Sequence, residues 1–125
     1  MTYPLAFSTW GNEEVEAIKR VIDTDMYTMG KHVKQFEKEF AETFGSPHAI
    51  MVNSGSSANL LMLSLLKWKY KLQGDIIAPV VGWATTYFPI VQNGFTINFV
   101  DVDPNTWNID IEKIEKSITP KTCAI

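Results

Sequence analysis

A Gly/Ser turn between two apolar segments is the part of this sequence best suited to chemistry. It runs Asn53-Ser-Gly-Ser-Ser-Ala58, and the apolar run Leu60–Leu66 follows it. We expect a helix to begin within the turn, with Gly55 allowing the backbone to turn tightly. The first N–H groups of a helix have no intrahelical acceptor and lie at the positive end of its dipole. Together with the hydroxyls of Ser56 and Ser57, these groups could bind a phosphate.

The turn alone does not identify a ligand, because serine also caps many helices that bind nothing. It lacks the lysine of a P-loop and the three-glycine pattern of a dinucleotide fold. Its Ser-Gly-Ser-Ser spacing also differs from the Gly-x-Ser-x-Gly of a nucleophile elbow. Phosphate binding and simple capping therefore both remain open at this point.

A tryptophan strengthens the case for a ligand. The segment Gly82-Trp-Ala-Thr-Thr-Tyr87 follows the expected strand Asp75–Ala78. In a parallel sheet, this loop and the serine turn would lie at the same edge, where open α/β sheets bind ligands. Trp83 could then stack on a flat ring whose phosphate lies at Ser56. Although Trp83 alone could equally be a core residue, the two features together favour a flat, phosphorylated cofactor.

Hydrophobic spacing predicts the elements that would position these residues. The expected helices cover about 12–24, 33–44, 85–92 and 110–118, and the expected strands are His48–Asn53, Asp75–Ala78 and Thr96–Asp101. Pro89 should shorten or kink the third of these helices. Strands that alternate with helices indicate a three-layer α/β/α fold with a mainly parallel sheet. Lys121–Ile125 resembles the start of a fourth strand, so we expect an incomplete, amino-terminal part of a domain.

Composition narrows the possible partners. The 125 residues carry a net charge of −3 with no dominant basic run, which argues against nucleic acid as a partner. The single cysteine excludes an internal disulfide and offers no metal cluster. The amino terminus lacks the pattern of a signal peptide, and no apolar run is long enough to span a membrane. We therefore expect a cytoplasmic protein that does not bind membranes.

Several ordered motifs resemble one family of enzymes. They are Tyr3–Ala6, Met26–Gly30, Val52–Leu60, Gly74–Ile77, Pro79–Pro89, Phe99–Asp103 and Asn108–Asp110. In this combination the chain resembles the pyridoxal-phosphate (PLP)-dependent sugar-nucleotide aminotransferases and dehydratases, and the likeness covers nearly all of it. The resemblance implies the aspartate aminotransferase fold (fold type I), with residues 31–125 as the first part of its large cofactor-binding domain. Residues 1–30 would form an amino-terminal helix and a substrate-side loop.

Within the family, the motifs are most similar to those of the dehydratases. The resemblance implies removal of the C3 hydroxyl from a nucleotide-linked 4-keto-6-deoxyhexose, on the route to dideoxy sugars of lipopolysaccharide O-antigens. The cofactor would be pyridoxamine phosphate (PMP), formed from PLP with glutamate as the amino donor. A PLP-dependent sugar-nucleotide aminotransferase is the alternative. A non-catalytic ligand-binding or interaction fragment is an alternative of another class.

The resemblance also implies roles for individual residues. Gly55 and Ser56 match the turn that holds the cofactor phosphate, Ser57 would add its amide, and Trp83 matches the aromatic residue on the pyridine ring. The loop that would meet the nucleotide sugar, often across a homodimer interface, comprises Tyr27, Thr28, Met29 and Gly30.

The residue that separates the two reactions is expected beyond Ile125. The resemblance implies a lysine there in the aminotransferases and a histidine in the dehydratases. We expect neither His32 nor His48 to replace it, because one would lie on an exposed helix and the other at the start of a strand, away from the ligand edge. The 125-residue chain alone is therefore expected to lack turnover.

Overall fold

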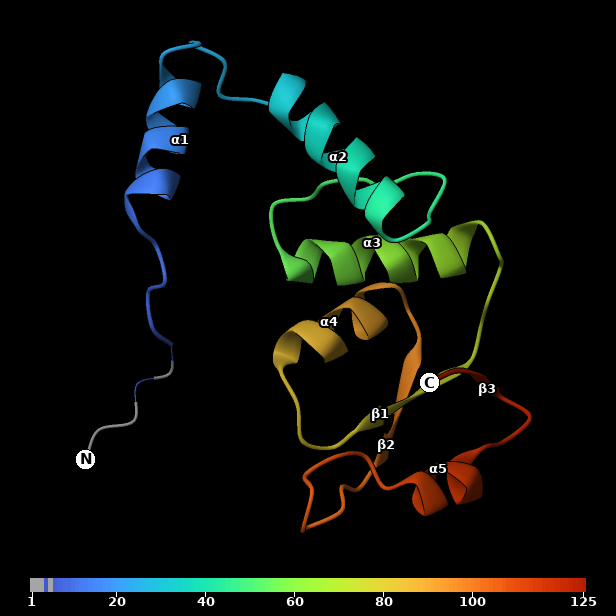
Figure 1. Ribbon diagram of the computed structural model, residues 1–125. Coiled ribbons are helices and arrows are strands. Elements are labelled where there is room, and N and C mark those ends of the chain that lie inside the picture. The colour runs from blue at the N-terminus through green and yellow to red at the C-terminus, as the bar shows by residue number, and fades with distance from the viewer. Residues whose placement is uncertain (1–3, 5) are drawn as a thin grey trace. The chain divides into compact units, whose positions relative to one another are not determined.

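The computed structural model describes Pro4 and residues 6–125. Part of the Tyr3–Ala6 motif thus lies outside the described residues. The chain divides into two compact units, Met1–Met51 and Val52–Ile125, and each is described by itself (Figure 1). The predicted phosphate turn and Trp83 belong to the second unit, whereas the predicted sugar-side loop belongs to the first.

Two amphipathic helices make up most of the first unit. They are α1, Asn12–Ile22, and α2, Lys31–Thr43. Both were expected, although α1 ends two residues earlier than predicted, where Thr24 N–H donates to the Val21 carbonyl in a turn. Phe36 and Phe40 of α2 and Phe44, its C-cap, follow one another with ring centroids 5.7 and 4.5 Å apart. The apolar spacing therefore predicted the helices correctly and their ends to within two residues.

The strand expected at His48–Asn53 is absent, and that prediction was wrong. In the structure these residues lie between α2 and α3 without forming a strand. Apolar alternation shows only that a segment could join a sheet, because a strand also needs a neighbour to accept its backbone hydrogen bonds. None of the three strands in the described sheet pairs with this segment.

The second unit is an alternation of helices and parallel strands. Its elements are α3, Gly55–Trp68; β1, Asp75–Pro79; α4, Ala84–Gln92; β2, Thr96–Val100; α5, Ile111–Ser117; and β3, Thr122–Ala124. The sheet order is β2-β1-β3, and both strand pairs are parallel. The strand expected at 121–125, the fourth in the prediction, is present as the short β3. It is the third strand of the structure because His48–Asn53 does not form one. The α/β class and the parallel sheet are confirmed.

Helices cover both faces of this sheet. Figure 1 shows α3 and α4 on one side of the strands and α5 on the other. Two consecutive residues of β2 demonstrate the arrangement, since neighbouring side chains point to opposite faces. The Phe99 ring meets Tyr87 of α4 at 5.3 Å between centroids, while the Asn98 amide donates to the Ser117 carbonyl of α5 at 3.0 Å. The second unit therefore has the predicted three layers.

The core of the second unit lies between β1 and the helices α3 and α4. Ile76, Ala78, Ile90 and Phe95 are buried there. Ile77, between the two strand residues, is only 2% exposed on the opposite face. This burial on both faces explains why β1 is apolar throughout.

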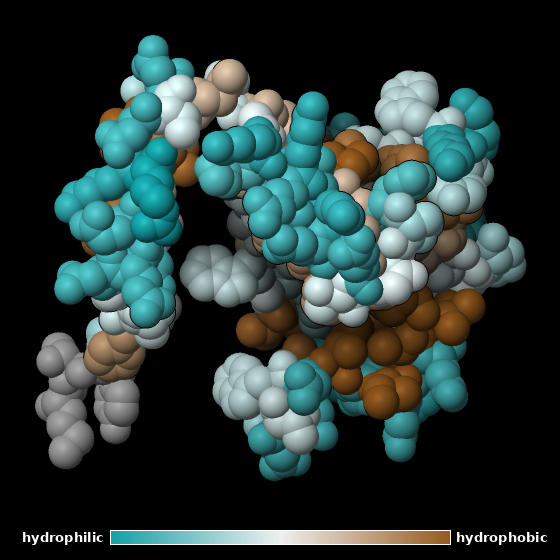
Figure 2. Space-filling model, turned by 45° about the horizontal axis from the view of Figure 1, so that its top comes forward, coloured by the Kyte–Doolittle hydropathy of each residue, from teal (hydrophilic) through white to brown (hydrophobic). Residues whose placement is uncertain are grey.

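Much apolar surface is left uncovered. Leu61 and Leu65 of α3 are each 47% exposed, and Figure 2 shows apolar side chains gathered at the surface in brown.

Among the described residues, no helix is both long and apolar enough to cross a membrane.

Candidate functional site

Helix α3 begins at Gly55, one residue before the two serines that were predicted to bind a phosphate. Ser54 is the N-cap, and its hydroxyl accepts a hydrogen bond from Ser57 N–H at 3.2 Å. Its carbonyl accepts the first intrahelical bond, from Ala58 N–H at 3.1 Å. Gly55 and Ser56 therefore occupy the first two helical positions, where N–H groups have no intrahelical acceptor. Both residues are exposed.

Ser57 differs from its neighbours because the chain itself uses both of its polar groups. Its N–H donates to Ser54, and its hydroxyl donates to Asn53 Oδ1 at 2.6 Å. Within the part of the chain that the structure describes, the donors of Gly55 and Ser56 have no such partner, so their N–H groups and the Ser56 hydroxyl can face a ligand. Sequence reasoning missed the capping role of Ser54, although serine at a helix start is the ordinary signal for it.

Gly55 is not required by the fold of its own chain. It does not have a positive φ, so the expected tight turn does not need a glycine. A Cβ built at this position would meet no atom within 4 Å. The space beside two free N–H groups at the end of a 14-residue helix is therefore open. That donor set and that opening fit a phosphate group.

Trp83 is exposed beside this turn. It is the N-cap of α4, with extended backbone angles, and its side chain is 71% exposed. The core alternative for Trp83 therefore does not hold in this chain. An exposed indole at the end of a loop can present its face to a planar group.

A hydrogen bond joins the starts of α3 and α4. Asn59 Nδ2, one turn after Gly55, donates to the Thr85 carbonyl at 3.2 Å, two residues after Trp83. Figure 1 likewise shows both helices beginning at the same end of the second unit. The structure thus brings Gly55, Ser56 and Trp83 to one edge, the carboxyl edge of the sheet.

The loop that carries Trp83 is held by Tyr87. The Tyr87 hydroxyl donates to the Pro79 carbonyl at 2.7 Å, across the loop from β1 to α4. A Cβ at Gly82 would overlap that hydroxyl, so only glycine leaves room for the contact. Sequence reasoning treated Tyr87 only as part of a motif and missed this role.

An ion cluster follows β2. The Lys113 ammonium lies 3.3 Å from a carboxylate oxygen of both Asp101 and Asp110. A hydrogen bond from Val102 N–H, followed by the bond from Lys113, lowers the pKa of Asp101. Hydrogen bonds to Asp101 and then to Asp110 raise the pKa of Lys113. The cluster joins the end of β2 to the start of α5 and remains ionised at neutral pH.

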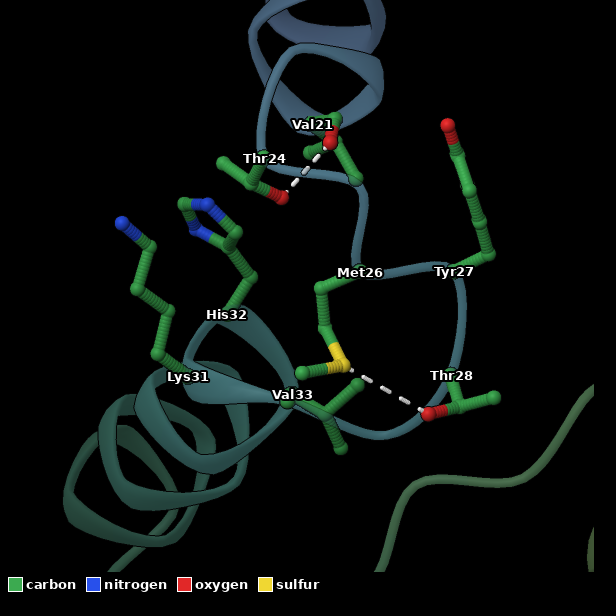
Figure 3. Close-up of a pocket in the computed structure, with 9 residues that line it drawn as sticks. Val21, Thr24, Met26, Tyr27, Thr28, Lys31, His32 and Val33 are labelled. Carbon is green, nitrogen blue, oxygen red and sulfur yellow. Dashed lines mark hydrogen bonds between the residues drawn. The ribbon is translucent and has the colours of Figure 1, made fainter.

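The predicted sugar-side loop lies over a cavity of the first unit (Figure 3). The cavity measures about 420 Å³, and Tyr27, Thr28 and Gly30 contribute to its lining. Met29 is 67% exposed and does not line it. The lining surface is mostly apolar, and its polar residues include Thr24, Thr28, Lys31 and His32. In the part of the chain that the structure describes, no group of three or more potential metal ligands occurs.

The second unit combines a parallel sheet, helices on both faces and unpaired helix N–H groups beside an exposed aromatic residue. That combination defines an α/β protein whose carboxyl sheet edge has the donors and the aromatic surface that suit a phosphorylated, planar ligand. Residues 8–125 match the model of the DegT/DnrJ/EryC1/StrS aminotransferase family. The chain belongs to this family.

The chain is similar to GDP-4-keto-6-deoxy-D-mannose 3-dehydratases. It is 52% identical to the enzyme of Yersinia pseudotuberculosis, over all of this chain and 33% of the relative. The Escherichia coli enzyme, solved with bound hydrated PLP, is 50% identical over 97% of this chain and 32% of its own, with a TM-score of 0.86. Another structure of such a dehydratase, with a trapped PLP-glutamate geminal diamine, is 51% identical over the same shares of both chains, with a TM-score of 0.86. The chain thus spans about a third of the length of these relatives.

Proposed function

We propose that the chain is the cofactor-binding part of a PMP-dependent dehydratase that removes the C3 hydroxyl from a nucleotide-linked 4-keto-6-deoxyhexose. The observation that supports this proposal most strongly is the 50–52% identity to GDP-4-keto-6-deoxymannose 3-dehydratases across nearly the whole chain. The geometry supports the same conclusion, because free N–H groups and an exposed indole share one edge of the sheet. The product would supply dideoxy sugars for a polysaccharide such as an O-antigen.

Each site residue has a defined task in this proposal. The N–H groups of Gly55 and Ser56 and the Ser56 hydroxyl bind the cofactor phosphate, and Ser57 holds the turn in shape through Ser54 and Asn53. The exposed Trp83 indole stacks on the pyridine ring and fixes its plane. When bound, the cofactor would supply an amine for the C4 ketone of the sugar and a ring that can hold the electron pair left by proton removal and release it as the hydroxyl leaves.

The partners follow from the same relatives. Glutamate is the amino donor, in keeping with the PLP-glutamate adduct of one related dehydratase. The nucleotide is guanosine diphosphate, in keeping with the names of the related enzymes. Residues 1–30 form the substrate side, with the loop of Tyr27, Thr28, Met29 and Gly30 contacting the nucleotide sugar across a homodimer interface. Residues 31–125 form the first part of the large domain of a cytoplasmic enzyme.

The second candidate is a PLP-dependent sugar-nucleotide aminotransferase, because the family takes its name from such enzymes. The two reactions need different bases. An aminotransferase requires a lysine that binds the cofactor covalently, whereas a dehydratase of this type uses a base that does not. A non-catalytic fragment that merely retained the turn is the remaining alternative.

Chemical reduction of the cofactor complex distinguishes these functions. The whole protein is loaded with PLP, reduced with borohydride, digested and examined by mass spectrometry. We expect PLP to bind, and the cofactor to leave the protein on denaturation with none of it fixed to a lysine. A peptide with cofactor fixed to a lysine would replace the dehydratase by the aminotransferase. A protein that binds no PLP would support the non-catalytic alternative.

Gly55→Ala should weaken cofactor binding without lowering the stability of the fold. Apart from its chain neighbours and the adjacent helix backbone, the added methyl group would meet no atom within 4 Å. Alanine at a helical position stabilises the fold by about 0.5–1 kcal/mol relative to glycine. The same methyl group would stand where the phosphate approaches. We expect unchanged or higher resistance to urea and roughly tenfold weaker PLP binding in a fluorescence titration, about 1.4 kcal/mol. Unchanged PLP affinity would show that the phosphate lies elsewhere.

A further inference from the structure

We propose that Asn59 is a positioning residue, which sets the orientation of the Trp83 indole relative to the phosphate turn. The inference rests on the proposed function, since it concerns how one edge of the sheet holds a phosphate and a planar ring together. Asn59 acts through its hydrogen bond to the Thr85 carbonyl, at 3.2 Å.

The bond exists because of a proline. Pro89 lies inside α4, and a residue at that position would ordinarily donate its N–H to the Thr85 carbonyl four residues earlier. Proline has no N–H, and its ring pushes against that carbonyl. The oxygen therefore lacks its usual helical partner. Asn59 Nδ2 reaches it from α3, so an interruption within one helix becomes the attachment point for the other.

The location of the bond matters more than its strength. Asn59 lies four residues after Gly55, and Thr85 lies two residues after Trp83. The bond thus joins the end of α3 that offers free N–H groups to the end of α4 that presents the indole. Without it, the start of α4 could shift while the turn at Gly55 remained unchanged. The predicted consequence is a misplaced ring with an intact phosphate site.

A second bond between the same helices provides a matched comparison. The Ser64 hydroxyl donates to Asn93 Oδ1 at 3.0 Å, at the opposite end of α4. This bond also links α3 to the end of α4; it is partly buried, whereas the Asn59 bond is exposed. Loss of either bond removes one contact between α3 and α4. Only the loss of the Asn59 bond should alter the ligand edge.

The test compares Asn59→Asp with Ser64→Ala in the whole protein. Aspartate has the shape of asparagine, but its carboxylate cannot donate to a carbonyl. We expect Asn59→Asp to weaken PLP binding about tenfold, about 1.4 kcal/mol. We also expect a smaller induced circular dichroism signal from PLP at saturation, because the ring orientation changes. Asn59→Ala, which removes the donor without adding charge, should act in the same direction. In this uncharged variant, competition by inorganic phosphate should keep its wild-type inhibition constant.

The control should behave differently in each binding measurement. Ser64→Ala should lower the urea midpoint while leaving the PLP affinity and the dichroism at wild-type values. Equal changes in the two variants, or unchanged dichroism in both Asn59 variants, would overturn the positioning role and leave the proposed function intact. A wild-type protein that binds no PLP would overturn both proposals together.

Discussion

Replacing Ser56 by glutamate is expected to weaken PLP binding by roughly 100-fold or more, about 2.7 kcal/mol. The carboxylate would accept hydrogen bonds from the free N–H groups at the start of α3, where a negative charge is favourable. It would also repel the dianionic phosphate at close range. Because the side chain is exposed and the charge suits a helix start, folding should be undisturbed. A fluorescence titration with PLP and a urea unfolding curve would measure the two effects.

Ser56→Gln is the matched control for this change. Glutamine has the size of glutamate without its charge, so it removes the hydroxyl and adds bulk only. We expect it to weaken PLP binding by about tenfold, well short of the glutamate effect. Equal losses in the two variants would mean that bulk decides and that no anion lies at this turn. Wild-type affinity in the glutamate variant would contradict the phosphate assignment outright.

The second large effect concerns folding. Gly74→Ala is expected to destabilise the protein by at least ~3 kcal/mol, because two costs combine. Gly74 has a φ of +125°, a conformation that L side chains rarely adopt, and a Cβ there would overlap the Lys121 carbonyl. That carbonyl accepts the Asp75 N–H bond that joins β1 to the residues before β3. Relief of the overlap would therefore separate the central strand from its neighbour. Urea unfolding of the whole protein would show the loss.

Gly94→Ala provides the comparison. Gly94 also has a positive φ, +73°, but a Cβ at this position would meet no atom within 4 Å. Only the backbone cost of about 1–2 kcal/mol should then appear. A Gly74 variant no less stable than the Gly94 variant would show that the strand pairing tolerates the added methyl group. Neither variant should change the order in which the strands pair.

The spacing of hydrophobic residues along the sequence predicted most helices and strands of the second unit. The apolar run Asp75–Ala78 lies within β1, and the segment 96–101 contains β2. Both strands pair with each other in register, so their apolar pattern and their neighbours agree. Pro89 was expected to shorten or kink α4. It lies inside a helix of nine residues, and the Thr85 carbonyl, one turn earlier, accepts a hydrogen bond from Asn59 instead.

The segment His48–Asn53 shows where pattern was insufficient. Its composition suits a strand as well as that of β1 does, yet it forms none. A helix closes its hydrogen bonds within its own segment, so its spacing predicts it directly. A strand depends on a neighbour supplied by another part of the chain. Apolar alternation alone therefore predicts strands less securely than helices.

For the site, the sequence by itself determined the residue types and their order along the chain. The serine turn, the tryptophan and the family motifs could all be recognised without coordinates. Only the tertiary structure decided that Ser54 caps α3, that the chain uses Ser57 internally, and that Trp83 is exposed rather than in the core. It also revealed the bond between Asn59 and Thr85, 26 residues apart. The physical reason is that capping, exposure and long-range hydrogen bonds depend on which groups meet in space, and spacing along a chain does not specify such meetings.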